Sequence, residues 1–152
     1  MILLDTTILV YAVGSEHGAR DPSRRLLEAI GAGRVAATTT VEVIQEFVRV
    51  YAWRRARAAA VELARRYVTL LTPLLVAGEH ELDHGLKLFE SQAELGAFDA
   101  VLAATALSHG ADALVSADQS FASVPGLAHV APGSDAFEFA PGHVSAAGAL
   151  SL

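Results

Sequence analysis

The chain opens with Ile2-Leu3-Leu4-Asp5-Thr6-Thr7, and this short stretch already indicates a class of fold. Its apolar run lacks helical spacing, so it is expected to be a short buried strand that ends at Asp5. An acidic residue that closes the first strand of a buried sheet is costly unless something pairs with its charge. Asp5 is therefore the first indication of a functional site.

The rest of the chain alternates short apolar runs with longer segments of helical periodicity. Further strands are predicted at 34–38, 74–76 and 113–116, with 128–130 as a fifth, and helices at 21–31, 41–51, 56–71, 79–92 and 98–109. Strands that alternate with helices of ten or more residues indicate right-handed crossovers and a parallel sheet. The predicted fold class is therefore α/β, with a parallel four- to five-stranded sheet flanked by helices on both faces.

Three of these helices carry more specific expectations. Asp21 and Pro22 are predicted to be the N-cap and the first residue of their helix, and Thr40 is a predicted N-cap for the next one. The 98–109 segment is apolar on both faces and is expected to be sandwiched inside the fold. In the 79–92 helix, the apolar side chains predicted to face inward are Leu82, Leu86 and Phe89.

Length and composition limit the organisation of the chain. With 152 residues, of which 53% are hydrophobic, it can bury one real core but not comfortably two. We expect a single domain over 1–132 and a Gly-, Ala- and Ser-rich tail over 133–152 that is poorly ordered or binds a partner. No apolar run reaches the roughly 18 uncharged residues of a membrane span. The absence of cysteine and of a basic leader favours a cytoplasmic location.

The charge is distributed unevenly. The net charge of −6 disfavours a protein that coats nucleic acid through bulk electrostatics. However, all eleven basic residues lie at or before Lys87, and ten of them are arginines, which bind phosphate in a bidentate manner. Clustered arginines are consistent with a solvated helix face, an RNA-facing rim or a surface for an acidic peptide.

Four carboxylates are placed where they could share one site. Asp5 and Asp118 each follow a predicted strand, and ligand sites of parallel sheets form at the carboxyl ends of the strands. Asp99 opens a predicted helix, and Glu46 lies within another. Like charges at short range repel each other, and a raised pKa or a bound divalent cation relieves the repulsion. This pattern predicts a metal-dependent enzyme that acts on phosphate esters.

Four segments, taken in order, resemble the motif series of PIN-domain ribonucleases, and most of all the VapC toxins of bacterial toxin-antitoxin pairs. They are Leu4 to Tyr11, Thr40 to Phe47, Phe98 to Ala106 and Leu114 to Phe121. The resemblance covers residues 1 to about 130. It implies a single PIN-like domain and a Mg²⁺- or Mn²⁺-dependent endoribonuclease that cleaves RNA. It also implies a homodimer that is inhibited by a small antitoxin protein.

Position by position, the resemblance implies that the catalytic acids are Asp5, Glu46, Asp99 and Asp118. It also implies that the metal ligands among them are Asp5, Asp99 and Asp118. Thr6, Thr7 and Ser116 would orient the carboxylates or metal-bound waters. Glu42 shares a helix face with Glu46, but the family spacing from Thr40 selects Glu46, which leaves Glu42 in a supporting position. The candidates for substrate binding are Arg49, Arg54 and Arg55.

Other functions remain open at this point. His80-Glu81-Leu82-Asp83-His84 matches the H-E-x-x-H pattern of zinc peptidases, although Asp83 and Gly85 are unusual there and no third ligand is clear. An aspartyl-phosphate phosphatase would require an aspartate where Thr7 stands. A catalytically silent PIN-like module that binds only a partner is the non-enzymatic alternative.

Overall fold

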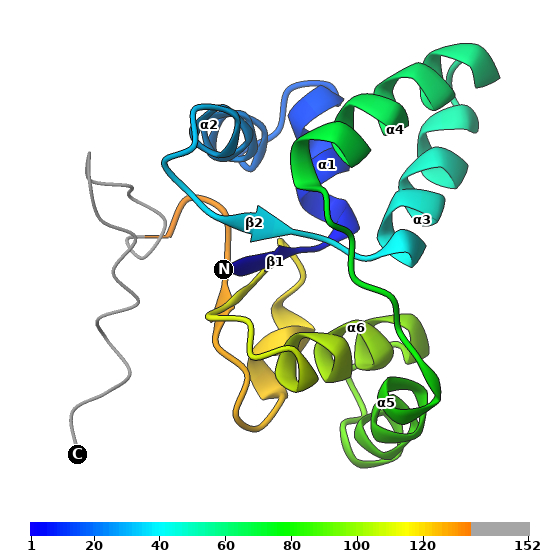
Figure 1. Ribbon diagram of the computed structural model, residues 1–152, viewed down its shortest axis with the longest axis vertical. Coiled ribbons are helices and arrows are strands. Elements are labelled where there is room, and N and C mark those ends of the chain that lie inside the picture. Colours follow the sequence, from blue (N-terminus) through cyan, green and yellow to red (C-terminus); the bar gives the residue numbers. More distant parts are fainter. Residues whose placement is uncertain (135–152) are drawn as a thin grey trace.

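A computed structural model describes residues 1–134. Four parallel strands form one sheet in the order β2-β1-β3-β4 (Figure 1). They are β1 (Ile2–Leu4), β2 (Ala37–Thr38), β3 (Leu114–Val115) and β4 (His129–Val130). The central strands β1 and β3 are buried along their whole length, as expected for a sheet covered on both faces.

Helices cover both faces of this sheet. Figure 1 shows α1 to α4 on one side and α5 and α6 on the other. The helices are α1 (Thr6–Val13), α2 (Arg20–Gly31), α3 (Val41–Ala52), α4 (Arg57–Leu71), α5 (Glu79–Ser91) and α6 (Ala97–Ser108), followed by the 3₁₀ helix η1 (Gln119–Ser123). The predicted α/β class and the parallel four-stranded sheet are confirmed.

Local signals explain the start of α3, and side-chain contacts hold the helices in place. The Thr40 hydroxyl accepts a hydrogen bond from the Val43 N–H, which confirms Thr40 as the N-cap of α3. Helix α6 is buried along most of its length, as predicted, and lies between the sheet and α5 (Figure 1). The Tyr67 hydroxyl donates a hydrogen bond to the Leu9 carbonyl and so attaches α4 to α1.

Two predicted elements differ in the structure. The 74–76 run is not a strand of the sheet, because Leu75 forms only one isolated bridge with Thr40. Pro73 cannot donate a backbone hydrogen bond, and the segment crosses from the α4 side of the molecule to α5 (Figure 1). Helix α2 begins at Arg20 after Ala19, without a side-chain cap. Pro22 still lies within its first turn, where no N–H is needed.

The prediction of which face of α5 points inward is wrong. Leu82, Leu86 and Phe89 are about half exposed, whereas Gly85 and Leu88 are buried. The reason is a close helix contact, since a Cβ atom on Gly85 would lie only 2.7 Å from the Val101 Cα of α6. The helix turns its smallest residue toward α6, and the larger apolar residues remain on the outer face.

The boundary expected at residue 132 and the 133–152 tail remain predictions, since residues 135–152 lie outside the described part of the chain. Among residues 1–134, none of the helices has the length and apolar character that crossing a membrane requires.

Candidate active site

The strand ends bring Asp5 and Asp118 to one edge of the sheet. Asp5 follows β1, and Asp118 follows the neighbouring strand β3 after two intervening residues. Each aspartate also caps the helix that comes next, because Asp5 accepts from the Thr7 N–H and Asp118 from the Ser120 N–H. Asp5 is buried, and Asp118 is exposed.

Hydroxyl groups hold Asp5 in place. Its Oδ2 atom accepts hydrogen bonds from the Thr7 hydroxyl at 2.7 Å and from the Ser116 hydroxyl at 2.7 Å. The same Ser116 oxygen accepts from the Asp118 N–H at 2.9 Å, and the Thr7 oxygen accepts from the Ala117 N–H at 3.0 Å. Ser116 therefore connects the buried carboxylate to the backbone that carries the exposed one.

Glu46 reaches the site from α3. The Thr6 hydroxyl donates to its Oε2 atom at 2.7 Å, which ties α3 to the first residue of α1. The Arg49 guanidinium lies 3.2 Å from the other oxygen, Oε1. Sequence reasoning assigned Arg49 to substrate and missed this ion pair, which the i, i+3 spacing on one helix could have indicated.

The charges of the other three acids all act on Asp99. Burial is the largest cause that raises the pKa of the Asp99 carboxyl, and the charges of Asp5, Asp118 and Glu46 add to it in that order; together they bring the pKa to about 6. Asp99 is in the first turn of α6, after Gly96, where a Cβ atom would lie 2.7 Å from the Asp99 Oδ2 atom. The four carboxylates thus form one acidic cluster, called here the acidic quartet.

The donor set of the quartet suits a hard divalent cation. Mg²⁺ and Mn²⁺ prefer carboxylate oxygens and retain several water ligands. The raised pKa of Asp99 reflects its burial first and then the repulsion of the other three acids, which no basic side chain offsets at Asp99. Within residues 1–134, no three acidic or histidine side chains enclose a common ion position in their present conformations. The chemistry of the residues fits a metal, and their present geometry is that of an open cluster.

Glu42 does not join the quartet. Its charge is not among those that shift Asp99, and it lines a cavity of about 30 Å³ with Phe98 and Leu102. Its Oε2 atom is buried and has no hydrogen-bond partner within the described residues. Of the two glutamates on this helix face, Glu46 is the one directed to the other acids.

Two of the arginines assigned to substrate lie in the turn between α3 and α4. Arg54 and Arg55 line a groove whose walls include Val13 of α1 and Tyr51 of α3. Neither arginine forms an ion pair within residues 1–134. Both are exposed, so their charges are available to an anionic ligand.

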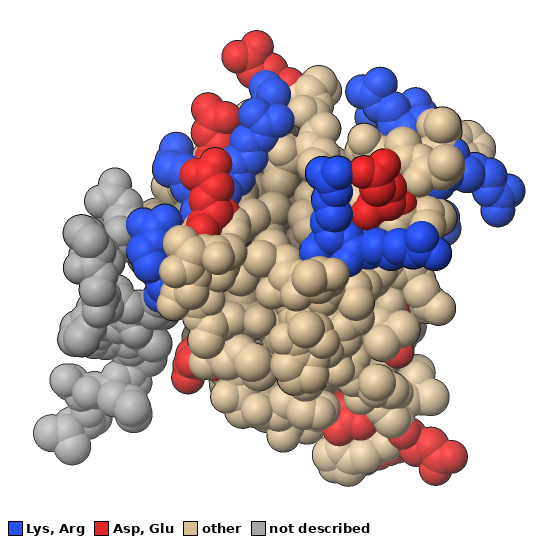
Figure 2. All heavy atoms as spheres, turned by 45° about the horizontal axis from the view of Figure 1, so that its top comes forward, with Lys and Arg blue, Asp and Glu red and all other residues tan. Residues whose placement is uncertain are grey.

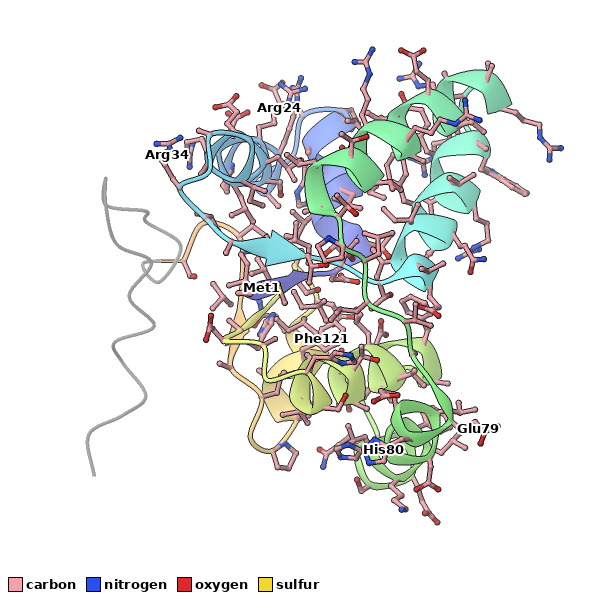
Figure 3. The ribbon with its side chains drawn as sticks, in the orientation of Figure 1. Met1, Arg24, Arg34, Glu79, His80 and Phe121 are labelled. Atoms are coloured by element: carbon pink, nitrogen blue, oxygen red, sulfur yellow. The ribbon has the colours of Figure 1, made fainter. Side chains whose placement is uncertain are left out.

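The zinc alternative has no support in the described part of the chain. Glu81 is a helix-capping residue, since its carboxylate accepts from the Gly78 N–H and from the Ser108 hydroxyl, both at 2.9 Å. The Gly78 bond is the main reason why the pKa of Glu81 falls to about 2. Figure 3 shows His80 on α5, on the far side of α6 from the strands. No zinc-binding group of three ligands exists among residues 1–134.

Comparisons with known proteins identify the family of the chain. A family model described as PIN domain matches residues 2–127. Ribonuclease VapC7 of Mycobacterium tuberculosis is 53% identical over 138 residues, which cover 87% of this chain and 92% of that protein. Ribonuclease VapC13 of the same species is 29% identical over 131 residues, which cover 86% of this chain and 100% of that protein.

Solved structures share the fold at low identity. The crystal structure of FitAcB from Neisseria gonorrhoeae superposes with a TM-score of 0.70 at 18% identity, covering 87% of this chain and 98% of that one. A toxin-antitoxin complex from Klebsiella pneumoniae gives 0.65 at 20% identity, with the same coverage. Family model, relatives and fold together show that the chain belongs to the PIN-domain family and, within it, to the VapC-type ribonuclease toxins.

Proposed function

We propose that this VapC-type ribonuclease cleaves RNA phosphodiester bonds at the acidic quartet, with Mg²⁺ or Mn²⁺ held by Asp5, Asp99 and Asp118. The observation that carries the proposal is the convergence of the four carboxylates, in which the Ser116 hydroxyl joins Asp5 to the backbone of Asp118. Burial and the charges of the other three acids raise the pKa of Asp99, in line with this arrangement. Such a cluster is unstable without a cation or a proton, and a nuclease needs the cation. When bound, the ion would supply an activated water and would neutralise charge on the scissile phosphate.

The chain's own residues have separate roles in this proposal. Ser116 and Thr7 fix the Asp5 carboxylate, and the hydroxyl of Ser116 also positions Asp118. Thr6 and Arg49 hold Glu46, which would orient the attacking water or accept its proton. Asp99 is partly exposed and Asp118 is exposed, so both have room to rotate toward a shared ligand.

The partners follow from the family and from the surface. Arg54 and Arg55, with Arg49 once it is released from Glu46, would bind substrate phosphates. The relatives carry the name ribonuclease, and a structural neighbour is a toxin-antitoxin complex. We therefore propose a small antitoxin protein as the inhibitor of this chain. The homodimer is proposed from the family resemblance alone.

The Asp99→Asn variant tests the proposal. It should abolish RNA cleavage in Mg²⁺ or Mn²⁺ while the domain becomes more stable, because the substitution removes repulsion within the quartet. The combination of lost activity and gained stability excludes unfolding as the cause.

Asp83→Asn is the matched control. Asp83 is an exposed aspartate on α5, paired with Lys87, and its variant should cleave like the wild type. Undiminished cleavage by Asp99→Asn would refute the site. Failure of the wild type to cleave RNA or to bind Mn²⁺ would instead identify a catalytically silent module.

A further inference from the structure

The chain has a single tryptophan, and this residue is almost completely exposed. Trp53 is 88% accessible and forms the C-cap of α3 at the start of the turn into α4. An indole ring is the largest apolar side chain and is usually buried for most of its surface. Arg54 and Arg55 follow it directly, and Arg57 begins α4. The turn thus combines one free aromatic face with several positive charges.

Helix geometry places Trp53 on the same side of α3 as the quartet residue Glu46. Trp53 keeps helical dihedral angles, with φ −59° and ψ −32°, so the helical period still applies to it. It follows Glu46 by seven positions, which at 3.6 residues per turn returns to the same face. The rise along α3 between them is about 10 Å. Arg49 lies between them and contacts Glu46.

The charge of this side of the molecule favours an anionic chain. Figure 2 shows basic side chains gathered over the face that carries α2 and the α3–α4 hairpin. Within residues 1–134, Arg54, Arg55 and Arg57 form no ion pair. A nucleic acid strand advances by about 3.4 Å per stacked nucleotide, so about three nucleotides span the distance from Glu46 to Trp53.

We propose that Trp53 stacks on an unpaired base of the substrate RNA, about three nucleotides from the cleaved bond, while Arg54 and Arg55 bind the adjacent phosphates. This proposal rests on the ribonuclease function proposed above. Proteins recognise single-stranded RNA by stacking its splayed bases on aromatic side chains beside basic groups. The α3 face would thus select RNA that is unpaired next to the cleavage site. An acidic segment of a protein is the competing occupant of this surface. Its binding would not explain why Trp53 lies on the same face of α3 as Glu46.

The single tryptophan makes the proposal directly measurable. Asp99→Asn protein, which binds without cleaving, would be titrated with an unstructured RNA of about ten nucleotides while Trp53 fluorescence is recorded. We expect saturable quenching by the single strand and little quenching by the same RNA annealed into a duplex or by inorganic polyphosphate. Equal quenching by polyphosphate, or none by the single strand, would overturn the stacking proposal.

Variants supply the second measurement. Because Trp53 is exposed, Trp53→Ala should fold normally, bind labelled RNA roughly tenfold more weakly and raise KM with kcat unchanged. Trp53→Phe should recover part of the loss, since phenylalanine retains a smaller stacking face. The controls are Phe89→Ala, an exposed aromatic on α5, and Lys87→Ala, an exposed cation on the same helix, and both should bind normally.

The outcomes separate the two proposals. Unchanged RNA affinity in Trp53→Ala would refute the stacking role even if the quartet is catalytic. A Trp53→Ala variant that binds RNA normally but binds a partner protein more weakly would also refute the stacking role. Cleavage by Asp99→Asn would refute the quartet, whereas the binding comparison between wild type and Trp53→Ala would still stand.

Discussion

Ser116 is the residue on which the geometry of the quartet depends most. Its hydroxyl is fully buried, donates to Asp5 and accepts from the Asp118 N–H. In Ser116→Ala, the Asp118 N–H and the Asp5 carboxylate each lose a partner. We expect a loss of about 1–3 kcal/mol in the free energy of unfolding, measured with urea, and weaker RNA cleavage.

Ser23 provides the control for this prediction. It is equally buried, but its hydroxyl has no hydrogen-bond partner within the described residues. Ser23→Ala should therefore be neutral or slightly stabilising. If both serine variants lose the same stability, the hydrogen bonds of Ser116 are not the cause.

The sequence could predict which residues end the strands, but not how their side chains connect. Asp5 and Asp118 follow from the apolar runs before them, because the carboxyl ends of parallel strands meet at one edge. The hydroxyl network depends on side-chain conformations that leave no signal in the order of residues. Helical spacing alone leaves both Glu42 and Glu46 within reach, and the family spacing from Thr40 favours Glu46. The structure adds their surroundings, since the Thr6 hydroxyl binds Glu46 while the buried Glu42 Oε2 atom has no partner within the described residues.

At the scale of elements, periodicity predicted where the helices lie better than which face they bury. Leu82, Leu86 and Phe89 have the spacing of a core-facing stripe, yet they are about half exposed. The contact is set by Gly85, since α5 can approach the Val101 backbone closely only without a side chain there. From the sequence alone, a strand of two residues such as β2 is also hard to distinguish from the 74–76 run, which forms only one isolated bridge.

Gly85→Ala tests this account of helix packing. In most helices an alanine stabilises relative to glycine by roughly 0.5–1 kcal/mol. At Gly85 the new Cβ atom would meet the Val101 backbone at 2.7 Å, so we expect a loss of about 1–3 kcal/mol in the unfolding free energy. Thermal or urea unfolding would measure the change.

Gly31→Ala is the matched substitution on α2. A Cβ atom at Gly31 would meet only the Leu70 side chain, at an ordinary contact distance of 3.6 Å. This variant should be stabilised by about 0.4–1 kcal/mol. A stabilised Gly85→Ala would show that α5 can move away from α6 at little cost.

At the scale of the whole molecule, charge is divided between two sides. The arginines lie on α2, α3, α4 and the turns beside them, and α5 carries the only lysine. The quartet draws on helices from both faces of the sheet, since Glu46 belongs to α3 and Asp99 to α6. A substrate anion would be attracted to the basic side and would meet an acidic centre, which a bound cation would make compatible with phosphate.

The free energy of unfolding of the whole chain should depend on pH because of this acidic centre. The pKa of Asp99 is about 6 in the folded state, against an ordinary value of 3.8. The folded state therefore binds a proton more tightly than the unfolded state between these values, so stability falls as pH rises from about 4 to about 6. Since solvent partly screens Asp99, we expect a loss of about 1–2 kcal/mol. Asp99→Asn should lack this slope.

A divalent cation should reverse the loss at neutral pH. Mn²⁺ that binds only the folded chain stabilises it by about 2.7 kcal/mol at a hundredfold excess over Kd. At pH 5 the Asp99 proton competes with the ion, so the stabilisation should be smaller than at pH 7. Thermal unfolding with Mn²⁺ or with EDTA at both pH values measures the difference. An equal Mn²⁺ effect in wild type and Asp99→Asn, or an effect independent of pH, would place the ion away from the quartet.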